Sequence, residues 1–308
     1  MLQAGRKITK WLPFDPVRRS LIISFFAVFA VLAASCDWPN IIPQGNAPLR
    51  YRDQVFSNVT VTNGITYGSA VNLEGQTVQL LLDMYNPTGD HNPRRPAIVW
   101  VHGGSFVVGN RTEGDVVDEA TTFAKEGYVN VSIDYRLERP GCSGNLSNCA
   151  GAVQEAFQDA QTAVLWLRGH APKYGVDSDR IAIAGTSAGA ITALNVGYST
   201  SEDPAARVRA VASLSGAYLN LGGGVGAISK GDAPALDFHC TTDPLVPFGA
   251  AQATLSSAKA QGLEMFLETF NETCHAPYVE HRTQILTQEN NFFYHELDLA
   301  HAKDSQKP

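Results

Sequence analysis

The sequence predicts a single α/β domain built on a doubly wound, mostly parallel sheet with antiparallel strands at its start. Short β-rich runs alternate with helical patterns along the chain. The sequence shows no internal repeat of about 20 to 50 residues, which a solenoid or propeller would have. One unbroken apolar run, 97–101, is typical of a parallel strand buried on both faces. With 308 residues, 44% of them apolar, the chain can bury a sizeable core.

The N-terminal half predicts an antiparallel edge followed by the first parallel strands. Segments 59–62 and 79–85 are β-rich and flank a glycine-bearing turn, so we expect them to pair as antiparallel strands. The next predicted elements are the buried strand 97–101, a helix over 116–126, a strand at 128–133 and a cysteine-bounded loop at 140–152.

The C-terminal half alternates helices and strands, as a parallel sheet with crossover helices requires. Residues 156–174 carry apolar positions at a period of 3.6 residues, which predicts a helix. The run 180–184 is β-rich, and a helix of small residues follows it. The remaining predicted elements are strands at 208–214, 235–239 and 263–270, a helix near 250–260 and a closing helix that begins at Tyr278.

Residues 1–35 predict an export signal, because five basic residues precede the apolar run 21–34. That run has 14 residues, whereas a membrane-spanning helix needs about 20. It ends in Leu32-Ala33-Ala34-Ser35-Cys36, which is similar to a bacterial lipobox except that Ala33 stands where leucine is usual. Ordinary signal peptidase could cut at the same bond. Membrane attachment through a lipidated Cys36 and plain secretion or periplasmic release are therefore both open.

The charge of the chain argues against nucleic acid as a partner. The net charge is −7, and without residues 1–35 it falls to about −11. An acidic domain without a basic stripe does not attract a phosphate backbone. We expect a small-molecule or polymer-linked substrate instead.

Four cysteines besides Cys36 suit an exported, disulfide-bonded chain. They allow three pairings. Cys142 and Cys149 flank a loop rich in Gly, Ser and Asn and can close it locally, which leaves Cys240 to pair with Cys274. We expect no metal, because no His or Cys residues lie at the short spacings of a structural zinc site.

Gly185-Thr186-Ser187-Ala188-Gly189 fits the pattern G-x-S-x-G, between a predicted strand and a helix of small residues. A serine on so sharp a strand-to-helix turn needs small neighbours, because the two elements pack closely there. We therefore predict that Ser187 is a nucleophile.

A second glycine-rich segment, His102-Gly103-Gly104-Ser105, follows the buried strand and precedes Ser187 by 85 residues. Glycines let the backbone approach a substrate and direct its amides inward. We predict an oxyanion hole formed by the amides of Gly104, Ser105 and Ala188. His102 is expected to brace the loop rather than act as the base.

The predicted acid is Asp243, which lies just past the strand at 235–239 and before a proline turn. Asp237 is the alternative, but it sits inside that strand. Four histidines follow Asp243, and His275 is the one in a loop after the next strand. The expected chain order Ser187, Asp243, His275 is the one found in triads whose serine lies on a turn between a strand and a helix. The remaining three histidines are His281, His295 and His301.

The predicted triad and the predicted disulfide support each other. Cys240 lies three residues before Asp243, and Cys274 immediately precedes His275. A bond between the two cysteines would hold both loops together.

These motifs resemble the α/β-hydrolase superfamily, in particular bacterial carboxylesterases and the related feruloyl-esterase-like group with HGG-type oxyanion loops. The resemblance covers most of residues 55–290 and includes 134–137 and 239–247. It implies an α/β-hydrolase domain at 55–300, between a lead-in at 36–54 and a polar tail at 301–308. It also implies ester hydrolysis through an acyl-enzyme without a cofactor. Ser105 and Cys240 depart from the family pattern, since glycine is usual at both positions.

Only 55 residues separate Ser187 from Asp243, which leaves little chain for a cap domain. We therefore expect an open site that prefers short-chain or aromatic carboxylic esters. A serine peptidase or thioesterase on the same fold is the alternative, since the triad alone does not choose the leaving group. A non-catalytic binding protein is disfavoured because all three triad residues are present.

Overall fold

The computed structural model describes residues 38–139, 141–142, 146–199, 204–220 and 226–302. The predicted export signal, Cys36 and most of the polar tail lie outside the described residues. In the described part, no helix has the length and apolar content that crossing a membrane would require.

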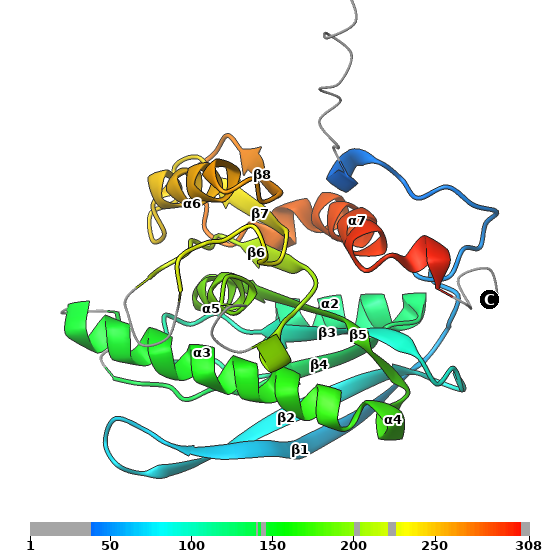
Figure 1. Cartoon of the computed structure of the whole chain (residues 1–308), viewed down its shortest axis with the longest axis horizontal. Coiled ribbons are helices and arrows are strands. Elements are labelled where there is room, and N and C mark those ends of the chain that lie inside the picture. The colour runs from blue at the N-terminus through cyan, green and yellow to red at the C-terminus, as the bar shows by residue number, and fades with distance from the viewer. Residues whose placement is uncertain (1–37, 140, 143–145, 200–203, 221–225, 303–308) are drawn as a thin grey trace, which may run out of the picture. The chain divides into compact units, whose positions relative to one another are not determined.

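An eight-stranded sheet, in the order β1-β2-β4-β3-β5-β6-β7-β8, organises the described domain (Figure 1). β1 pairs with β2, and β2 with β4, in antiparallel fashion, whereas all later pairs are parallel. The predicted doubly wound sheet with antiparallel strands at its start is therefore confirmed. The strands are β1 Val59–Val71, β2 Thr77–Pro87, β3 Arg95–Val101, β4 Val129–Ile133, β5 Val176–Thr186, β6 Val211–Leu214, β7 Ala235–Cys240 and β8 Met265–Phe270.

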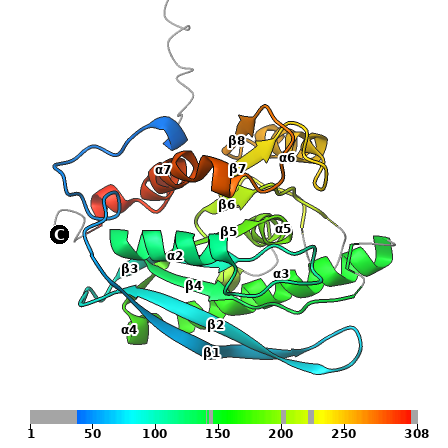
Figure 2. The same ribbon diagram turned by 180° about the vertical axis from the view of Figure 1, so that it is seen from behind.

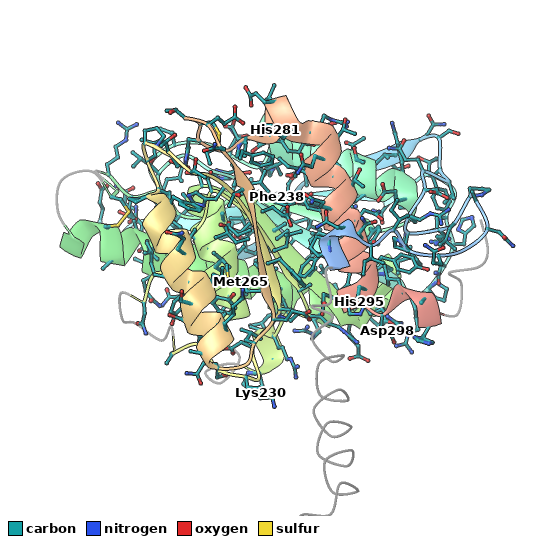
Figure 3. All side chains as sticks on the ribbon, turned by 90° about the horizontal axis from the view of Figure 1, so that it is seen from above. Lys230, Phe238, Met265, His281, His295 and Asp298 are labelled. Atoms are coloured by element: carbon teal, nitrogen blue, oxygen red, sulfur yellow. A yellow bond between two sulfur atoms is a disulfide. The ribbon has the colours of Figure 1, made fainter. Side chains whose placement is uncertain are left out.

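Helices cover both faces of the sheet, as a doubly wound topology requires. α3 and α5 pack on one face, and α2 lies on the other, which Figure 2 shows from behind. Figure 3 looks onto the β8 edge, where α6 and α7 lie on opposite sides of the strands. The helices are α2 Gly114–Glu126, α3 Leu146–Gly169, α4 Ala171–Tyr174, α5 Ala188–Gly197, α6 Phe248–Ala260 and α7 Tyr278–Glu296, with single turns at Trp38–Asn40, Pro204–Ala206 and Leu299–His301.

β3 shows why its sequence is apolar throughout. Val99 and Val101 face the core beneath α3 and α5, while Ile98 and Trp100 face the core beneath α2 and α7. All four side chains are fully buried. The Trp100 indole N–H donates to Asn130 Oδ1 at 2.9 Å, so the one polar atom of this set is satisfied.

The structure corrects two predicted boundaries. The loop expected at 140–152 is shorter, because α3 begins at Leu146 and includes Cys149. Ala152 and Val153 are buried in the core, so packing outweighs the loop-forming composition. The helix predicted over 156–174 ends at Gly169, and a separate single turn, α4, follows His170.

The described residues between Ser187 and Asp243 form α5, one helical turn, β6, β7 and connecting loops, without an inserted cap domain.

Candidate active site

Four loops meet at the carboxyl ends of neighbouring parallel strands, where α/β sheets place their functional groups. Ser187 directly follows β5, and Asp243 lies three residues after β7. His275 lies in the loop between β8 and α7, and the glycine-rich segment that begins at His102 follows β3. The parallel register thus brings residues from distant parts of the sequence to one edge.

Ser187 occupies a strained turn between β5 and α5. Its backbone has φ 55° and ψ −115°, a conformation that side-chain-bearing residues rarely adopt, and its amide donates to the Leu214 carbonyl at 2.8 Å. A Cβ atom at Gly189 would lie 2.0 Å from the Val101 carbonyl oxygen. Glycine is therefore required there, which is the physical reason for the second glycine of the motif.

The three predicted triad side chains form one continuous chain of hydrogen bonds. The Ser187 hydroxyl donates to His275 Nε2 at 2.8 Å. His275 Nδ1–H in turn donates to Asp243 Oδ2 at 2.8 Å and Oδ1 at 3.0 Å. The Asp243 side chain is fully buried, while that of His275 is 17% exposed, so the imidazole reaches solvent and the carboxylate does not.

Asp243 is held as a carboxylate. Burial disfavours its charged form, but hydrogen bonds from His275 and from the amides of Leu245 and Val246 outweigh burial and leave its pKa below the ordinary value. An ionised Asp243 can fix the orientation and tautomer of His275.

Two further contacts hold the His275 loop. Cys240 and Cys274 form a disulfide, so the residue before His275 is tied to the end of β7. The Ala276 amide donates to Ser215 Oγ at 3.0 Å. The Ser215 hydroxyl also helps to lower the pKa of Asp243, so the end of β6 acts on both loops. No sequence signal had singled out Ser215.

The amides predicted to form the oxyanion hole border the nucleophile. Gly104 and Ser105 line one cavity beside Ser187, and Ser105 and Ala188 line a second. Within the described residues, none of these three amides donates to another protein group. Gly104 has φ +110°, and a Cβ there would lie 2.0 Å from the Val108 carbonyl oxygen. Ser105, at the position where the family usually has glycine, has φ 55°.

His102 does not reach the triad. Its Nδ1 lies 2.6 Å from the Gly103 carbonyl oxygen, and its ring stacks on Tyr135 with 4.4 Å between the centroids. Burial lowers the pKa of His102, so the ring is neutral. The Tyr135 hydroxyl donates to the carbonyls of His102 and Gly103 and so braces the loop from below.

Two cavities of different character meet at Ser187. One, of about 340 Å³, is mainly apolar; its walls include Phe106, Ile191 and the disulfide of Cys142 with Cys149. The other, of about 370 Å³, is bordered by His275, Glu113 and Asp115. Leu245 lines both. The cleft therefore has an apolar side and an acidic side.

The alternative residues weighed from the sequence lie elsewhere. Asp237 is fully buried in β7 and hydrogen-bonds His239. The other three histidines pair locally with carboxylates: His281 with Glu272, His295 with Glu296 and His301 with Asp298.

The chain thus combines the α/β-hydrolase fold with a hydrogen-bonded Ser-His-Asp set at its strand ends. The family model BD-FAE matches residues 82–216, a segment that includes the oxyanion loop and Ser187. Esterase 2 of Thermogutta terrifontis, phosphorylated by paraoxon, is a structural neighbour with a TM-score of 0.62 and 23% identity. The likeness covers 80% of this chain and 97% of that one.

Curated relatives are similar over a shorter segment. Phenmedipham hydrolase of Pseudarthrobacter oxydans is 36% identical over 115 residues, which is 36% of this chain and 21% of that protein. Secreted lipase 5 of Gibberella zeae is 30% identical over 137 residues, which is 42% of this chain and 24% of that protein. The matched segment therefore spans about a fifth to a quarter of these relatives.

Proposed function

We propose that the protein is a serine carboxylesterase that hydrolyses carboxylic esters through an acyl-enzyme. The observation that carries the proposal is the continuous hydrogen-bonded chain from Ser187 through His275 to Asp243. It lies beside amides that have no acceptor among the residues the structure describes. The names of the relatives, which include hydrolases, carboxylesterases and lipases, support the same chemistry.

In the first half-reaction, Ser187 Oγ attacks the ester carbonyl while its proton passes to His275 Nε2. The oxyanion of the tetrahedral intermediate accepts hydrogen bonds from the amides of Gly104, Ser105 and Ala188. When the intermediate collapses, the bond to the alcohol oxygen breaks, and His275 gives its proton to the departing alcohol. Asp243 stabilises the imidazolium that forms in between.

In the second half-reaction, His275 takes a proton from water, and the hydroxide attacks the acyl group on Ser187. Collapse of the second tetrahedral intermediate breaks the bond to Ser187 Oγ, which recovers its proton from His275. The carboxylic acid leaves, and the enzyme returns to its starting state.

The character of the two cavities supports an assignment of the two halves of the ester. The leaving oxygen must reach His275 Nε2, so the alcohol occupies the cavity that His275 lines, next to Glu113 and Asp115. The acyl group then occupies the apolar cavity beside Ala188 and Ile191. A volume of about 340 Å³ accepts a short acyl chain or a single aromatic ring. Each methylene buried there adds about 0.8 kcal/mol of transfer free energy until the cavity is filled.

Covalent labelling tests the proposal. A fluorophosphonate probe should label the purified domain at Ser187, and p-nitrophenyl esters of acetate, butyrate and benzoate should be turned over. Ser187→Ala should abolish labelling and reduce kcat about 10⁴-fold or more, because the triad acts as a unit. His281→Ala, which changes a histidine outside the site, is the matched control. Full labelling of Ser187→Ala would refute the assignment.

We further propose that the protein is exported and matures at Cys36, because the disulfides suit an oxidising compartment. Fractionation of cells that express the full chain and Cys36→Ser distinguishes the two routes. Lipidation predicts a membrane-bound wild type and a released variant. A wild type already in the soluble exported fraction indicates ordinary signal cleavage, and retention in the cytoplasm contradicts export.

A further inference from the structure

A second histidine–aspartate pair lies directly behind the triad acid. His239, in β7, is completely buried. Its Nδ1 lies 3.1 Å from Asp237 Oδ2, and its Nε2 lies 3.0 Å from the Val246 carbonyl oxygen. The same Nε2 is 3.7 Å from Oδ2 of Asp243. This pair includes Asp237, which is the alternative candidate for the triad acid when only the sequence is considered.

Both ring nitrogens of His239 face oxygen acceptors. A neutral imidazole carries one N–H, whereas an imidazolium carries two and satisfies both contacts. The Asp237 carboxylate also accepts hydrogen bonds from the Ser213 hydroxyl and from the Gly216 amide at 3.3 Å. With three donors directed at Asp237, the ionised carboxylate is the satisfied form, and the proton resides on His239.

The opposing effects on the pKa of His239 support this assignment. Burial lowers it, but the hydrogen bond and charge of Asp237, the Val246 carbonyl and the charge of Asp243 together raise it above the ordinary value. Burial raises the pKa of Asp237 above its ordinary value, and His239, Ser213 and Gly216 oppose that rise without cancelling it. The pair as a whole therefore retains a proton, and the hydrogen bonds that Asp237 accepts favour its position on His239.

Few other polar groups surround the pair in the described structure. His275 lies beyond Asp243, and the Tyr198 phenol at the end of α5 interacts electrostatically with Asp237. From α6, the Phe248 ring approaches His239, with 5.9 Å between the centroids. The charges that act on His239 at close range are therefore those of Asp237 and Asp243.

We propose that His239, kept protonated by Asp237, is a positioning residue for the triad. Its Nε2–H holds the Val246 carbonyl and so fixes the turn whose amides bind Asp243. Its positive charge offsets part of the charge of Asp243. Removing the positive charge of His239 therefore leaves the Asp243 carboxylate, which accepts the His275 Nδ1–H, without this compensation. The inference rests on the proposed esterase function.

The decisive variant is the double substitution Asp237→Asn with His239→Gln, which keeps hydrogen-bonding groups but removes both charges. His239 Nε2 lies 3.7 Å from Asp243 Oδ2, so the loss of the His239 charge acts directly on the triad acid. We expect the acid limb of the kcat/KM pH profile to move to higher pH by about 0.5 to 1 unit, with KM nearly unchanged. His170→Gln is the matched control, since His170 contacts a backbone carbonyl, that of Trp166, far from the triad. An unmoved acid limb in a folded double variant would overturn the proposal.

A measurement on the wild-type chain covers the case in which the double variant does not fold. With ¹⁵N-labelled histidine, the His239 ring, assigned through its contacts to Val246, should show two N–H signals at pH 7 to 8. A single ring N–H would contradict a protonated His239. Fluorophosphonate labelling of the wild type separates the two hypotheses: failure to label counts against the esterase, whereas labelling with an unmoved acid limb counts against His239 alone.

Discussion

Leu245 lines both cavities that meet at Ser187, while its backbone amide donates to Asp243. Leu245 is 66% exposed, so the divider between the two cavities is an apolar group at the mouth of the cleft. The amide remains when the side chain is shortened. Substrate discrimination and triad geometry can therefore be separated at this one residue.

Leu245→Ala should widen the cleft without disturbing Asp243. We expect a loss of about 5- to 30-fold in kcat/KM for esters with apolar acyl groups, mainly through KM, which corresponds to about 1 to 2 kcal/mol of lost burial. Steady-state kinetics on an acyl series measures the change. A large fall in kcat for every ester alike would instead indicate damage to the triad.

The strain at Ser187 predicts that two substitutions of this residue differ in stability. Ser187→Gly should raise the free energy of unfolding by about 1 kcal/mol relative to Ser187→Ala, because glycine adopts φ 55° without steric strain. Both variants should be inactive. Denaturant unfolding of the pair measures the difference, and equal midpoints would show that the turn is relaxed.

The oxyanion loop should respond differently at its two neighbouring positions. Gly104→Ala places a Cβ against the Val108 carbonyl and should reduce kcat by about 10²-fold or more, since the loop must shift. Ser105→Gly should keep activity within a few-fold, because it removes a side chain from a positive-φ residue. Wild-type kcat in Gly104→Ala would exclude this amide as a donor.

The disulfide of Cys240 with Cys274 should matter more for activity than that of Cys142 with Cys149. Both close loops, and in the chain-entropy model the longer one stabilises by about 3 to 4 kcal/mol. Replacing Cys240 and Cys274 by Ala should also lower kcat, because the His275 loop loses its tie to β7. Replacing Cys142 and Cys149 by Ala is the matched control. Because these cysteines line the apolar cavity, the change should affect KM for esters with apolar acyl groups more than kcat. Peptide mapping without reduction checks both linkages.

Stability should fall with rising pH because of two carboxyl groups between α2 and α7. Glu289 is fully buried and has no hydrogen-bond partner among the described residues, and burial raises its pKa from 4.5 to about 8. Burial and the charge of Glu289 likewise raise the pKa of Glu119. The folded state then binds more protons than the unfolded state between pH 4.5 and about 8. The free energy of unfolding is therefore highest below pH 4.5 and decreases as the pH rises from 4.5 to about 8.

Glu289→Gln should therefore flatten the pH dependence and stabilise the protein at pH 8. The slope removed is at most about 1.4 kcal/mol per pH unit for each proton. Urea unfolding at pH 5, 6.5 and 8 measures it, and Glu280→Gln on the solvent side of α7 is the control. An identical slope in both variants would show that Glu289 is already ionised in the folded protein.

Local sequence patterns sufficed for much of this protein. Strand β3 can be predicted from the sequence because a strand buried on both faces consists of apolar residues. The elbow is recognisable because the contact of α5 with β3 excludes any side chain at Gly189. Chain order after Ser187 narrowed the candidates for the acid and the base to Asp243 and His275, since parallel strands bring successive loops to one edge of the sheet.

The tertiary structure alone decided what surrounds these groups. The helical start of α3 depends on burial of Ala152 and Val153, and the division of the cleft by Leu245 depends on two loops that meet in space. Asp237 reads as a rival acid in the sequence, yet the register of β7 turns it toward Ser213 and His239. A sequence pattern shows how residues are spaced within one strand or helix. Hydrogen-bond partners and compensating charges lie on different strands, and their side chains meet only when the sheet has formed.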